Sequence, residues 1–491
     1  MAALAPAGPS PARGGRQHAS SGGLAEALHA LAQLPDDVGL DVGCDEAEMQ
    51  RLGLMAWAYG VGGRFELRPS AGARATWVRG AERIPHDPRR TIAETVEGLW
   101  PPGVESWLGS GDDGVLEGHR VAVVSNLPAH YRIPLFAGIS RRLEAVGGSL
   151  RVLFLRSSAG SRTWLASEER LDFDHEVVPG VDLPVRRRPP RLPLGLGGAL
   201  RRHRPTIAVS AGLSPAVSGR VQRYARAAGI PFGLWSGEIA TIAARQPRVR
   251  QLQRRRLVQN ADFGIAYGAL ASRYLTSLAP TLPVVLARNT SVVAPAGPER
   301  RPRGENVELL TVGDLASPRK GVDVLVEALR AVPQEPCRLT VVGDGSLRKK
   351  LEREAASDDR VKFIGALPPA GVRAASAESD VFLFPSRSDV FGLVLVEAMS
   401  RGLAIAVSSA VGAVPDVTVP GHNCLVIGSH EPRSWADAIV RLVGDARLST
   451  RLGDAARRTI ARRWTIDHAV EGSLAGLRLG ARLAADGRRA R

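Results

Sequence analysis

The chain has 491 residues, of which 44% are hydrophobic and 23% are charged. This length exceeds what one hydrophobic core supports, so we expect two or three domains. The composition is typical of a soluble globular protein and excludes a largely disordered one. No apolar run reaches the roughly 18 residues that a membrane-spanning helix needs. The first residues also lack the charged and apolar regions of a signal peptide.

Three cysteines, Cys44, Cys337 and Cys424, lie far apart in the chain. Their spacing matches neither a disulfide framework nor a cluster of metal ligands. We therefore expect no metal site built on cysteine, and a reducing, cytoplasmic compartment.

The net charge is +16, and arginine supplies nearly all of it. The arginines cluster at residues 186–188, 191, 201–204 and 245–256. Such a patch has the charge to meet nucleic acid, anionic lipid or a phosphorylated acceptor. The simplest interpretation is a solvated, arginine-rich face. Among partners we favour an anionic surface on the inner face of a membrane and expect no nucleic acid.

The first 117 residues give a weak pattern. Residues 1–22 are rich in Pro, Gly, Ser and Ala and are expected to be a disordered leader. Residues 23–117 are expected to form a small α+β extension of unknown role. Helical spacing runs over residues 24–34, and Asp45 is placed to cap a second helix. Residues 109–114 read as a linker.

From residue 118 to 295 short apolar strands alternate with amphipathic stretches. We expect strands at 120–125, 150–155, 207–210, 232–235, 263–267 and 284–287, and a first helix over 133–146. Continuous apolar strands alternating with helices predict a doubly wound parallel sheet.

A proline-rich linker over 294–302 interrupts this alternation, which then restarts over residues 303–460. The expected strands are 308–312, 338–342, 361–364, 381–384 and 404–407, with helices at 322–331, 347–356 and 392–400. The fold class is therefore α/β, with two Rossmann-like domains facing each other across a cleft. Residues 461–491 are expected to form a return helix, which crosses back to the first domain over about 464–477, and a basic tail.

The strongest chemical signal is the stretch from Pro385 to Met399. A strand ends at Phe384, a turn carries Ser386 and Asp389, and a helix follows. Free backbone N–H groups at Gly392, Leu393 and Val394 predict an anion site at the helix start, reinforced by the helix dipole.

The helix after this turn is apolar on almost every side, so we expect it to be buried. Glu397 within it then needs a hydrogen-bonding partner, such as hydroxyl groups of a ligand. Asp389 lies on the turn, where its carboxylate could accept hydrogen bonds from a sugar ring. The simpler interpretation is a structural pairing for Glu397 and a helix cap for Asp389.

Two more strands of this domain end in glycine turns. Gly313 ends one strand, and Arg319 and Lys320 follow just before a helix. Two cations there can neutralise a leaving diphosphate. Gly343 and Gly345 close the next strand and permit close backbone approach. The strand after it, 361–364, is placed to present main-chain groups to a nucleobase.

This series resembles the C-terminal half of the group-one retaining glycosyltransferases (glycosyltransferase family four), which have the GT-B architecture of two Rossmann domains. The family pattern of two acidic residues separated by seven others appears here as Asp389 and Glu397. By resemblance, Glu397 binds the donor ribose and Asp389 the sugar hydroxyls. The resemblance further implies a donor site that includes Lys320, Gly313, Gly343, Gly345, Ile364, Ser386, Phe391, Gly392, Leu393 and Val394.

The resemblance implies transfer of a sugar from a nucleotide-diphosphate sugar to a glycan, lipid-linked or small-molecule acceptor, with retention and without a metal or other cofactor. Lys320, Arg319 and Asp389 are the expected catalytic residues, and synthesis of a cell-surface polysaccharide or glycoconjugate is the expected role. A stretch over 128–136 is similar to the family's acceptor-side loop. It places His130, Tyr131 and Arg132 on the acceptor side, and we add Glu238.

Three departures from the family pattern are visible. Asp314 stands where an arginine is common, and Arg319 is expected to substitute for it. A glycine pair is replaced by the segment 126–128. Asp389 is one methylene shorter than the family glutamate. Two alternatives therefore stay open, a non-catalytic relative that binds a nucleotide sugar and a GT-B nucleotide-sugar epimerase.

Two further motifs carry less weight. The segment 172–175 resembles the metal-binding aspartate pair of the other major glycosyltransferase fold, but it lacks the preceding apolar strand. We interpret it as the charged start of a strand. The segment 39–44 is similar to the first motif of S-adenosylmethionine methyltransferases, but it lacks the further glycine, and too little chain follows it.

Overall fold

The computed structural model describes residues 38–44, 65–69, 75–79, 82–85, 113–157, 171–182, 191–292 and 304–489. The chain divides into two compact units, Met1–Trp100 and Pro101–Arg491. The predicted leader, the two helices expected between residues 24 and 57, most of the 109–114 linker, the arginines at 186–188 and the 294–302 linker lie outside the described residues.

The described part of the first unit is a four-stranded sheet of order β2-β1-β3-β4. Its strands are β1 (Val38–Cys44), β2 (Phe65–Pro69), β3 (Ala75–Arg79) and β4 (Glu82–Pro85). Only β1 and β2 pair in parallel, and the other two pairs are antiparallel. The segment 39–44 therefore belongs to a strand of a small mixed sheet.

The second unit opens with a seven-stranded sheet of order β13-β12-β11-β10-β5-β6-β7 in which every pair is parallel. Its strands are β5 (Arg120–Ser125), β6 (Ser149–Phe154), β7 (His175–Val177), β10 (Ile207–Ala211), β11 (Phe232–Ser236), β12 (Phe263–Ala266) and β13 (Val284–Leu286). The chain winds outward from β5 in one direction and from β10 in the other. The switch point of the sheet therefore lies between these two strands.

Helices connect these strands, as a parallel sheet requires. They are α5 (Ile133–Glu144), α6 (Leu196–His203), α7 (Pro215–Ala228), α8 (Ala240–Ala243), α9 (Arg248–Gln259) and α10 (Ala269–Leu278). A short 3₁₀ helix, η2 (Asp113–Leu116), precedes β5, and a two-stranded ribbon is formed by β8 (Val181–Asp182) and β9 (Arg191–Leu192).

A second sheet of order β16-β15-β14-β17-β18-β19 follows, again parallel throughout. Its strands are β14 (Val307–Val312), β15 (Cys337–Val342), β16 (Val361–Gly365), β17 (Val381–Phe384), β18 (Ala404–Ser408) and β19 (Leu425–Ile427). This is the strand order of a Rossmann domain, with its switch point between β14 and β17. The predicted fold class is confirmed.

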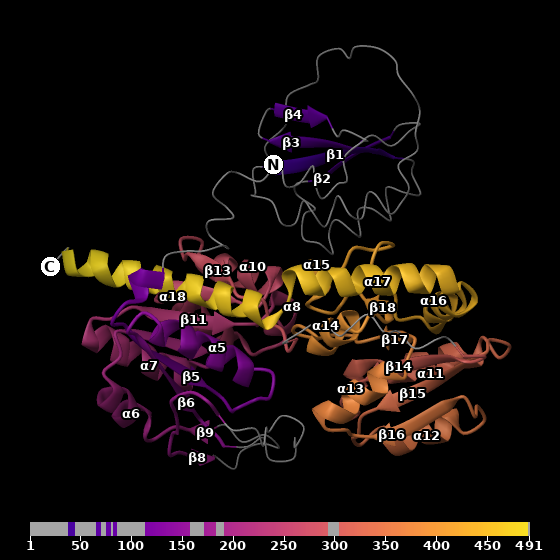
Figure 1. Ribbon diagram of the computed structural model, residues 1–491, viewed down its shortest axis with the longest axis horizontal. Coiled ribbons are helices and arrows are strands. Elements are labelled where there is room, and N and C mark those ends of the chain that lie inside the picture. Colours follow the sequence, from indigo (N-terminus) through magenta and orange to yellow (C-terminus); the bar gives the residue numbers. More distant parts are fainter. Residues whose placement is uncertain are drawn as a thin grey trace. The chain divides into compact units, whose positions relative to one another are not determined.

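The helical elements of this second domain are η4 (Pro318–Lys320), α11 (Val322–Arg330), α12 (Arg348–Ala355), α13 (Pro369–Ala377), α14 (Leu393–Ser400), α15 (Val414–Val417), α16 (Pro432–Gly444) and α17 (Ala446–Arg463). Both sheets are buried on two faces because helices cover each side (Figure 1). Strands β11, β17 and β18 are buried along their whole length, which explains why they read as continuous apolar runs.

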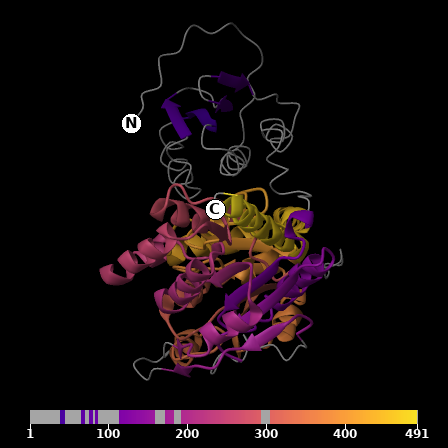
Figure 2. The ribbon, with the colours of Figure 1, turned by 90° about the vertical axis from the view of Figure 1, so that its left-hand side faces the viewer.

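The last helix, α18 (Ile466–Arg489), packs on α5, β12 and β13 of the first Rossmann domain. Its buried residues Ile466, Val470, Leu474 and Leu477 belong to the same core as α5. In both views the yellow C-terminal helix lies beside the purple N-terminal elements of this unit (Figure 1, Figure 2). The helix thus returns to the first Rossmann domain as expected, and it extends beyond the expected residues 464–477 to Arg489.

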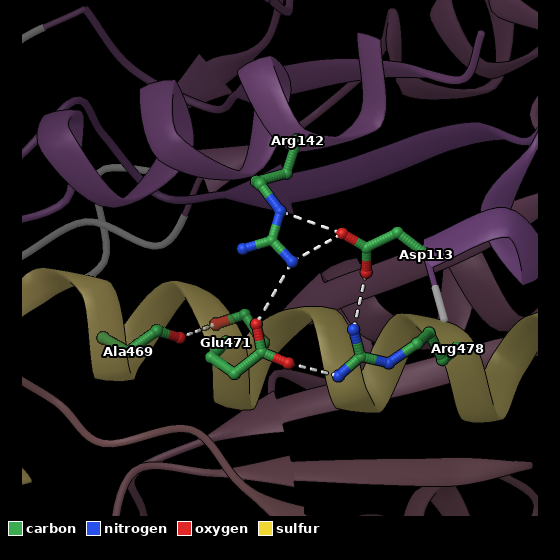
Figure 3. A network of polar contacts seen from close by, with 6 residues as sticks. Asp113, Arg142, Ala469, Glu471 and Arg478 are labelled. Carbon is green, nitrogen blue, oxygen red and sulfur yellow. Dashed lines mark hydrogen bonds and ion pairs between the residues drawn. The ribbon is translucent and has the colours of Figure 1, made fainter. Parts of the chain in front are cut away.

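An ion-pair network fixes α18 at its middle (Figure 3). Asp113 of η2 accepts hydrogen bonds from Arg478 Nη1 at 2.6 Å and from Arg142 of α5 at 2.6 and 2.8 Å. Glu471 pairs with the same two arginines. The Arg478 side chain is only 5% exposed, so its charge depends on these carboxylates. The end of the predicted linker is therefore a structured docking point for the C-terminal helix.

In the part of the chain that the structure describes, no helix combines the length and the apolar character needed to cross a lipid bilayer.

Replacing Asp113 with Asn tests this docking point. The substitution removes one of two carboxylates from a buried arginine, so we expect the free energy of unfolding to fall by about 1–3 kcal/mol. The control is Asp174→Asn, which breaks the exposed Arg151–Asp174 pair and should cost less than about 1 kcal/mol. Urea unfolding followed by circular dichroism measures both. Equal losses in the two variants would contradict the role of Asp113.

Candidate donor site and the comparisons with known proteins

The loops that follow β14 and β17 meet at the switch point of the second Rossmann domain. Arg387 N donates to Arg319 O at 2.8 Å, and Ser386 Oγ donates to the same carbonyl at 3.3 Å. Gly321 has φ +70°, and a Cβ there would lie 2.1 Å from Pro385 O. The glycine is needed because the two loops touch through their backbones.

An ion pair joins these two loops. Lys320 Nζ lies 2.6 Å from Asp389 Oδ2, and each side chain is 14% exposed. Arg319 donates to Ser388 O at 2.7 Å and lies 3.5 Å from the same Asp389 oxygen. Lys320 Nζ also stands 5.2 Å from the centre of the Phe384 ring. The three predicted catalytic residues are therefore in one cluster, with two cations around one carboxylate.

A second ion pair, between Arg387 and Asp323, stabilises the loop after β17. Arg387 makes two hydrogen bonds of 2.8 Å to the two carboxylate oxygens of Asp323, at the start of α11. Burial alone would raise the pKa of Asp323, but the hydrogen bonds and charge of Arg387 outweigh it and lower the pKa. Arg387 also donates to Pro318 O at 2.7 Å. This pair, which the sequence analysis missed, holds the β17 loop against η4.

The glycine turn after β15 packs against the turn after β14. A Cβ on Gly343 would lie 1.9 Å from Gly313 O, and one on Gly345 would lie 2.2 Å from Ala316 N. Both glycines have φ near +150°, a conformation that other residues rarely adopt. These two positions therefore require glycine, because a larger residue would clash with the turn after β14. Ile364 lies near the end of β16, beside this pair of turns.

The helix α14 begins at Leu393, with Gly392 at φ +90° just before it. Its first N–H groups, at Leu393 and Val394, have no carbonyl within the helix to bond and so point out of its N-terminus. Phe391 is buried beside them, and its N–H donates to Asp389 Oδ1 at 3.3 Å. The helix start and the Lys320–Asp389 pair are therefore parts of one loop.

Glu397 lies in the second turn of α14 and is partly buried. Its carboxylate accepts a hydrogen bond of 2.6 Å from Ser291 Oγ, in the segment that follows β13. Burial raises the pKa of Glu397, and the Ser291 hydrogen bond opposes this only in part. The partner that the sequence analysis required is thus a serine of the chain itself.

Asp416 of α15 is a carboxylate that the sequence analysis missed. It is 5% exposed, and its Oδ1 accepts a hydrogen bond of 2.9 Å from Ala269 N at the start of α10. Its Oδ2 is buried and has no hydrogen bond within the described residues. Burial raises the pKa of Asp416 to about 7. A Cβ on Gly268 would lie 2.3 Å from Oδ2, which explains why glycine precedes α10.

The residues predicted on the acceptor side lie in the first Rossmann domain. The loop between β5 and α5 ends with His130, Tyr131 and Arg132, and Glu238 follows β11. Arg132 is buried, whereas His130, Tyr131 and Glu238 are partly buried. Glu238 forms an ion pair of 2.9 Å with Arg254 of α9.

The remaining aspartates that the sequence analysis singled out are at positions 172, 174 and 314. Asp174 pairs with Arg151 at 2.6 Å. The described residues contain no group of three or more His, Cys, Asp or Glu side chains suited to a metal ion. The pair at 172 and 174 precedes β7, as the interpretation of a charged strand start requires. Asp314 Oδ1 accepts a hydrogen bond of 2.8 Å from Ala316 N, so this anion stabilises the turn after β14.

A family model described as glycosyl transferases group 1 matches residues 306–445. This range holds Arg319, Lys320 and Asp389, which we call the strand-end cluster. The chain carries a group 1 glycosyltransferase domain. The resemblance to the group-one glycosyltransferases is thereby confirmed. The D-inositol 3-phosphate glycosyltransferase of Corynebacterium glutamicum is 29% identical over 150 residues, which is 28% of this chain and 36% of that protein. The chain thus spans about a third of the length of the curated relatives that it matches.

Solved structures resemble both Rossmann domains of this chain. The sucrose-phosphate synthase of Thermosynechococcus elongatus has a TM-score of 0.58 at 19% identity, covering 76% of this chain and all of that one. HepE of Anabaena, in complex with UDP and glucose, has a TM-score of 0.56 at 16% identity and covers 72% and 97% of the two chains. At these identities the likeness shows the GT-B fold.

Asp416 generates a prediction about pH. A carboxylate whose pKa is raised in the folded state contributes stability at low pH that is lost as the pH rises through about 7. Asn at this position stays neutral, so we expect Asp416→Asn to gain stability relative to the parent between pH 5 and pH 8, by about 1–4 kcal/mol. Urea unfolding at the two pH values measures this.

The matched control for Asp416 is Asp437→Asn, on the exposed face of α16. Its difference from the parent should change little between the two pH values. A flat profile for Asp416→Asn as well would show that the carboxylate is ionised in the folded chain at both.

Proposed function

We propose that the chain transfers a glycosyl group from a nucleotide-diphosphate sugar to an acceptor hydroxyl, with retention of anomeric configuration and without a metal. The observation that carries the proposal is the convergence of Arg319, Lys320, Asp389 and the start of α14 at the switch point of the matched domain. Open α/β sheets bind ligands at this position.

The charge balance of this cluster suits a diphosphate. Lys320 and Arg319 together exceed the single negative charge of Asp389, and the N-terminus of α14 adds a partial positive charge. The ammonium group of Lys320 has three donors, so it can hold Asp389 and a phosphate oxygen together. In the reaction these groups would stabilise the negative charge that develops on the leaving diphosphate.

The two carboxylates would then bind the rest of the donor. Asp389, held by Lys320, would accept hydrogen bonds from sugar hydroxyls. Glu397 would bind the ribose, whose hydroxyls would replace or share the hydrogen bond from Ser291 Oγ. The acceptor hydroxyl would attack from the face that the diphosphate leaves. We do not assign a nucleophile to the chain.

The acceptor class follows from the relatives and the charge of the chain. The relatives include a D-inositol 3-phosphate glycosyltransferase, and one similar structure contains UDP and glucose. We propose a glycan, lipid-linked or small-molecule acceptor, and a role in cell-surface polysaccharide or glycoconjugate synthesis on the cytoplasmic side of the membrane. An epimerase needs no acceptor, so release of free nucleotide only when an acceptor is added would argue against that alternative.

Lys320→Ala tests the donor chemistry. We expect turnover to fall by a factor of about 100 to 1,000, because one charged donor to the leaving group is lost. The control is Lys362→Ala, which removes an exposed lysine of β16 in the same domain. The measurement is acceptor-dependent release of nucleotide, with circular dichroism to verify the fold. Near-normal turnover of a folded Lys320→Ala variant would refute the proposed role.

The exposed face of α9 supports the membrane part of the proposal. Val249 and Leu252 are 67% and 61% exposed, although both are apolar. Exposed arginines flank them at positions 248, 250, 255 and 256. An exposed apolar pair among cations is typical of a helix that lies on an anionic lipid surface.

Vesicle sedimentation tests this face. We expect the chain to bind vesicles that contain phosphatidylserine, and the binding to fall at least fivefold between 50 and 500 mM salt because the attraction is screened. The double variant Val249→Ser with Leu252→Ser should bind more weakly at every salt concentration. Ala240→Ser with Thr241→Ser, on the neighbouring exposed α8, is the control. Failure to bind these vesicles at low salt would overturn the membrane part of the proposal.

A further inference from the structure

Arg132 is a buried cation at the carboxyl edge of the first Rossmann sheet. The residue is 6% exposed and occupies the N-cap position of α5, at the end of the loop that leaves β5. Its Nη1 is buried without a hydrogen-bond partner, and no ion pair to it is found among the described residues. Because an isolated buried charge is unfavourable, this guanidinium would be stabilised by an anion, and the described residues do not supply one.

Three aromatic rings surround the guanidinium. Its central carbon lies 4.8 Å from the ring centre of Tyr267, 5.5 Å from that of Trp235 and 5.8 Å from that of Tyr131. Aromatic faces partly offset a positive charge, but they accept little at the in-plane N–H groups of arginine. The rings therefore position the guanidinium and leave its hydrogen-bonding edge for an oxyanion.

A second donor lies in the same cluster. Trp235 is 2% exposed, and its Nε1 is also buried without a partner in the described part of the chain. Trp235 belongs to β11 and Tyr267 follows β12, so the cluster gathers the carboxyl ends of β5, β11 and β12. Ligands of parallel sheets bind at this edge.

The carboxylate that the sequence analysis placed on this side, Glu238, forms no ion pair with Arg132 among the described residues. Glu238, which follows β11, is already paired with Arg254 at 2.9 Å. Within the described residues, Arg132 and Trp235 thus present two unsatisfied donors and one positive charge without an ion pair. Both donors are enclosed, so an oxyanion reaches them only when a neighbouring side chain rotates. Tyr131 is partly exposed and lies on the same loop as Arg132.

We propose that the acceptor carries an oxyanion, a phosphate or a carboxylate, which binds Arg132 and the Trp235 indole N–H. This inference rests on the proposed glycosyl transfer, for which it names the acceptor class. Arginine suits the task because its planar fork matches the oxygens of phosphate and carboxylate. A neutral acceptor would leave the buried charge as it is and gain nothing from it.

The first test measures binding without any transfer. The chain carrying Lys320→Ala, in which the donor cluster is weakened, is titrated with D-inositol 3-phosphate and with inositol by calorimetry. We expect saturable binding of the phosphate compound only. Adding Arg132→Lys should weaken it at least tenfold, because lysine keeps the charge but loses the fork. Adding Arg141→Lys, an exposed change on α5, should leave it unaltered.

Glucuronate against glucose serves as the carboxylate arm of the same titration. Binding of either charged compound that depends on Arg132 supports the inference. No binding of either, or binding that Arg132→Lys leaves unchanged in a chain with native circular dichroism, overturns it. Because no transfer is measured, these outcomes do not depend on whether the chain is an active glycosyltransferase.

The second test uses transfer. With a donor that the chain accepts, the ratio of kcat/KM for a charged acceptor to that for its neutral analogue should exceed ten. Arg132→Lys should reduce this ratio at least tenfold, chiefly through KM, while Arg141→Lys preserves it. Equal use of charged and neutral acceptors by the parent chain would refute the oxyanion site and leave the proposed glycosyl transfer standing.

Discussion

The ion pair between Lys320 and Asp389 joins two loops that leave the sheet where its winding reverses. Strands β14 and β17 are neighbours, and the chain continues from them to β15 on one side and to β18 on the other. The loops that follow the two strands meet at this ion pair. The Arg387–Asp323 pair and the contact of Gly321 with Pro385 hold the same two loops. The position of the α14 N-terminus therefore depends on this meeting of loops.

The Lys320–Asp389 ion pair leaves hydrogen-bonding capacity on Lys320 for a ligand. Lys320 and Asp389 are each 14% exposed, so they are only partly removed from solvent, and the ammonium group keeps donors that Asp389 does not use. Arg319 is more exposed and has a backbone carbonyl as its nearer partner. The cluster thus holds its shape through its own contacts and still offers positive charge to a diphosphate.

Other contacts connect the donor-side elements with the chain of the first Rossmann domain. Glu397 accepts from Ser291, and Asp416 accepts from Ala269. Trp464, which stacks on Phe391 at 18°, lies just before the helix that returns to α5. Both carboxylates have raised pKa values because they are buried. Two of the links between the Rossmann domains therefore involve carboxylates, Glu397 and Asp416, whose protonation depends on their burial.

Sequence reasoning succeeded where one short segment carries the information. The apolar strands and the glycine turns are local, and they predicted both sheets. The family resemblance placed Lys320 and Asp389, 69 positions apart, in one site, but it did not predict their ion pair. Sequence reasoning failed where the partner is distant in sequence. Nothing near Glu397 indicates Ser291, 106 positions away, and nothing near Asp416 indicates Ala269. The ion pair that anchors α18 was likewise hidden, because Asp113 and Arg478 are 365 positions apart.

The measurement that tests the central claim most directly is calorimetric titration with a panel of uridine, guanosine and adenosine diphosphate sugars. We expect at least one of these nucleotide sugars to bind the parent chain. The same compound should bind Lys320→Ala at least tenfold more weakly and Lys362→Ala as tightly as the parent. Binding that is indifferent to Lys320, or no binding by any member of the panel, would contradict the assignment of the strand-end cluster as a donor site.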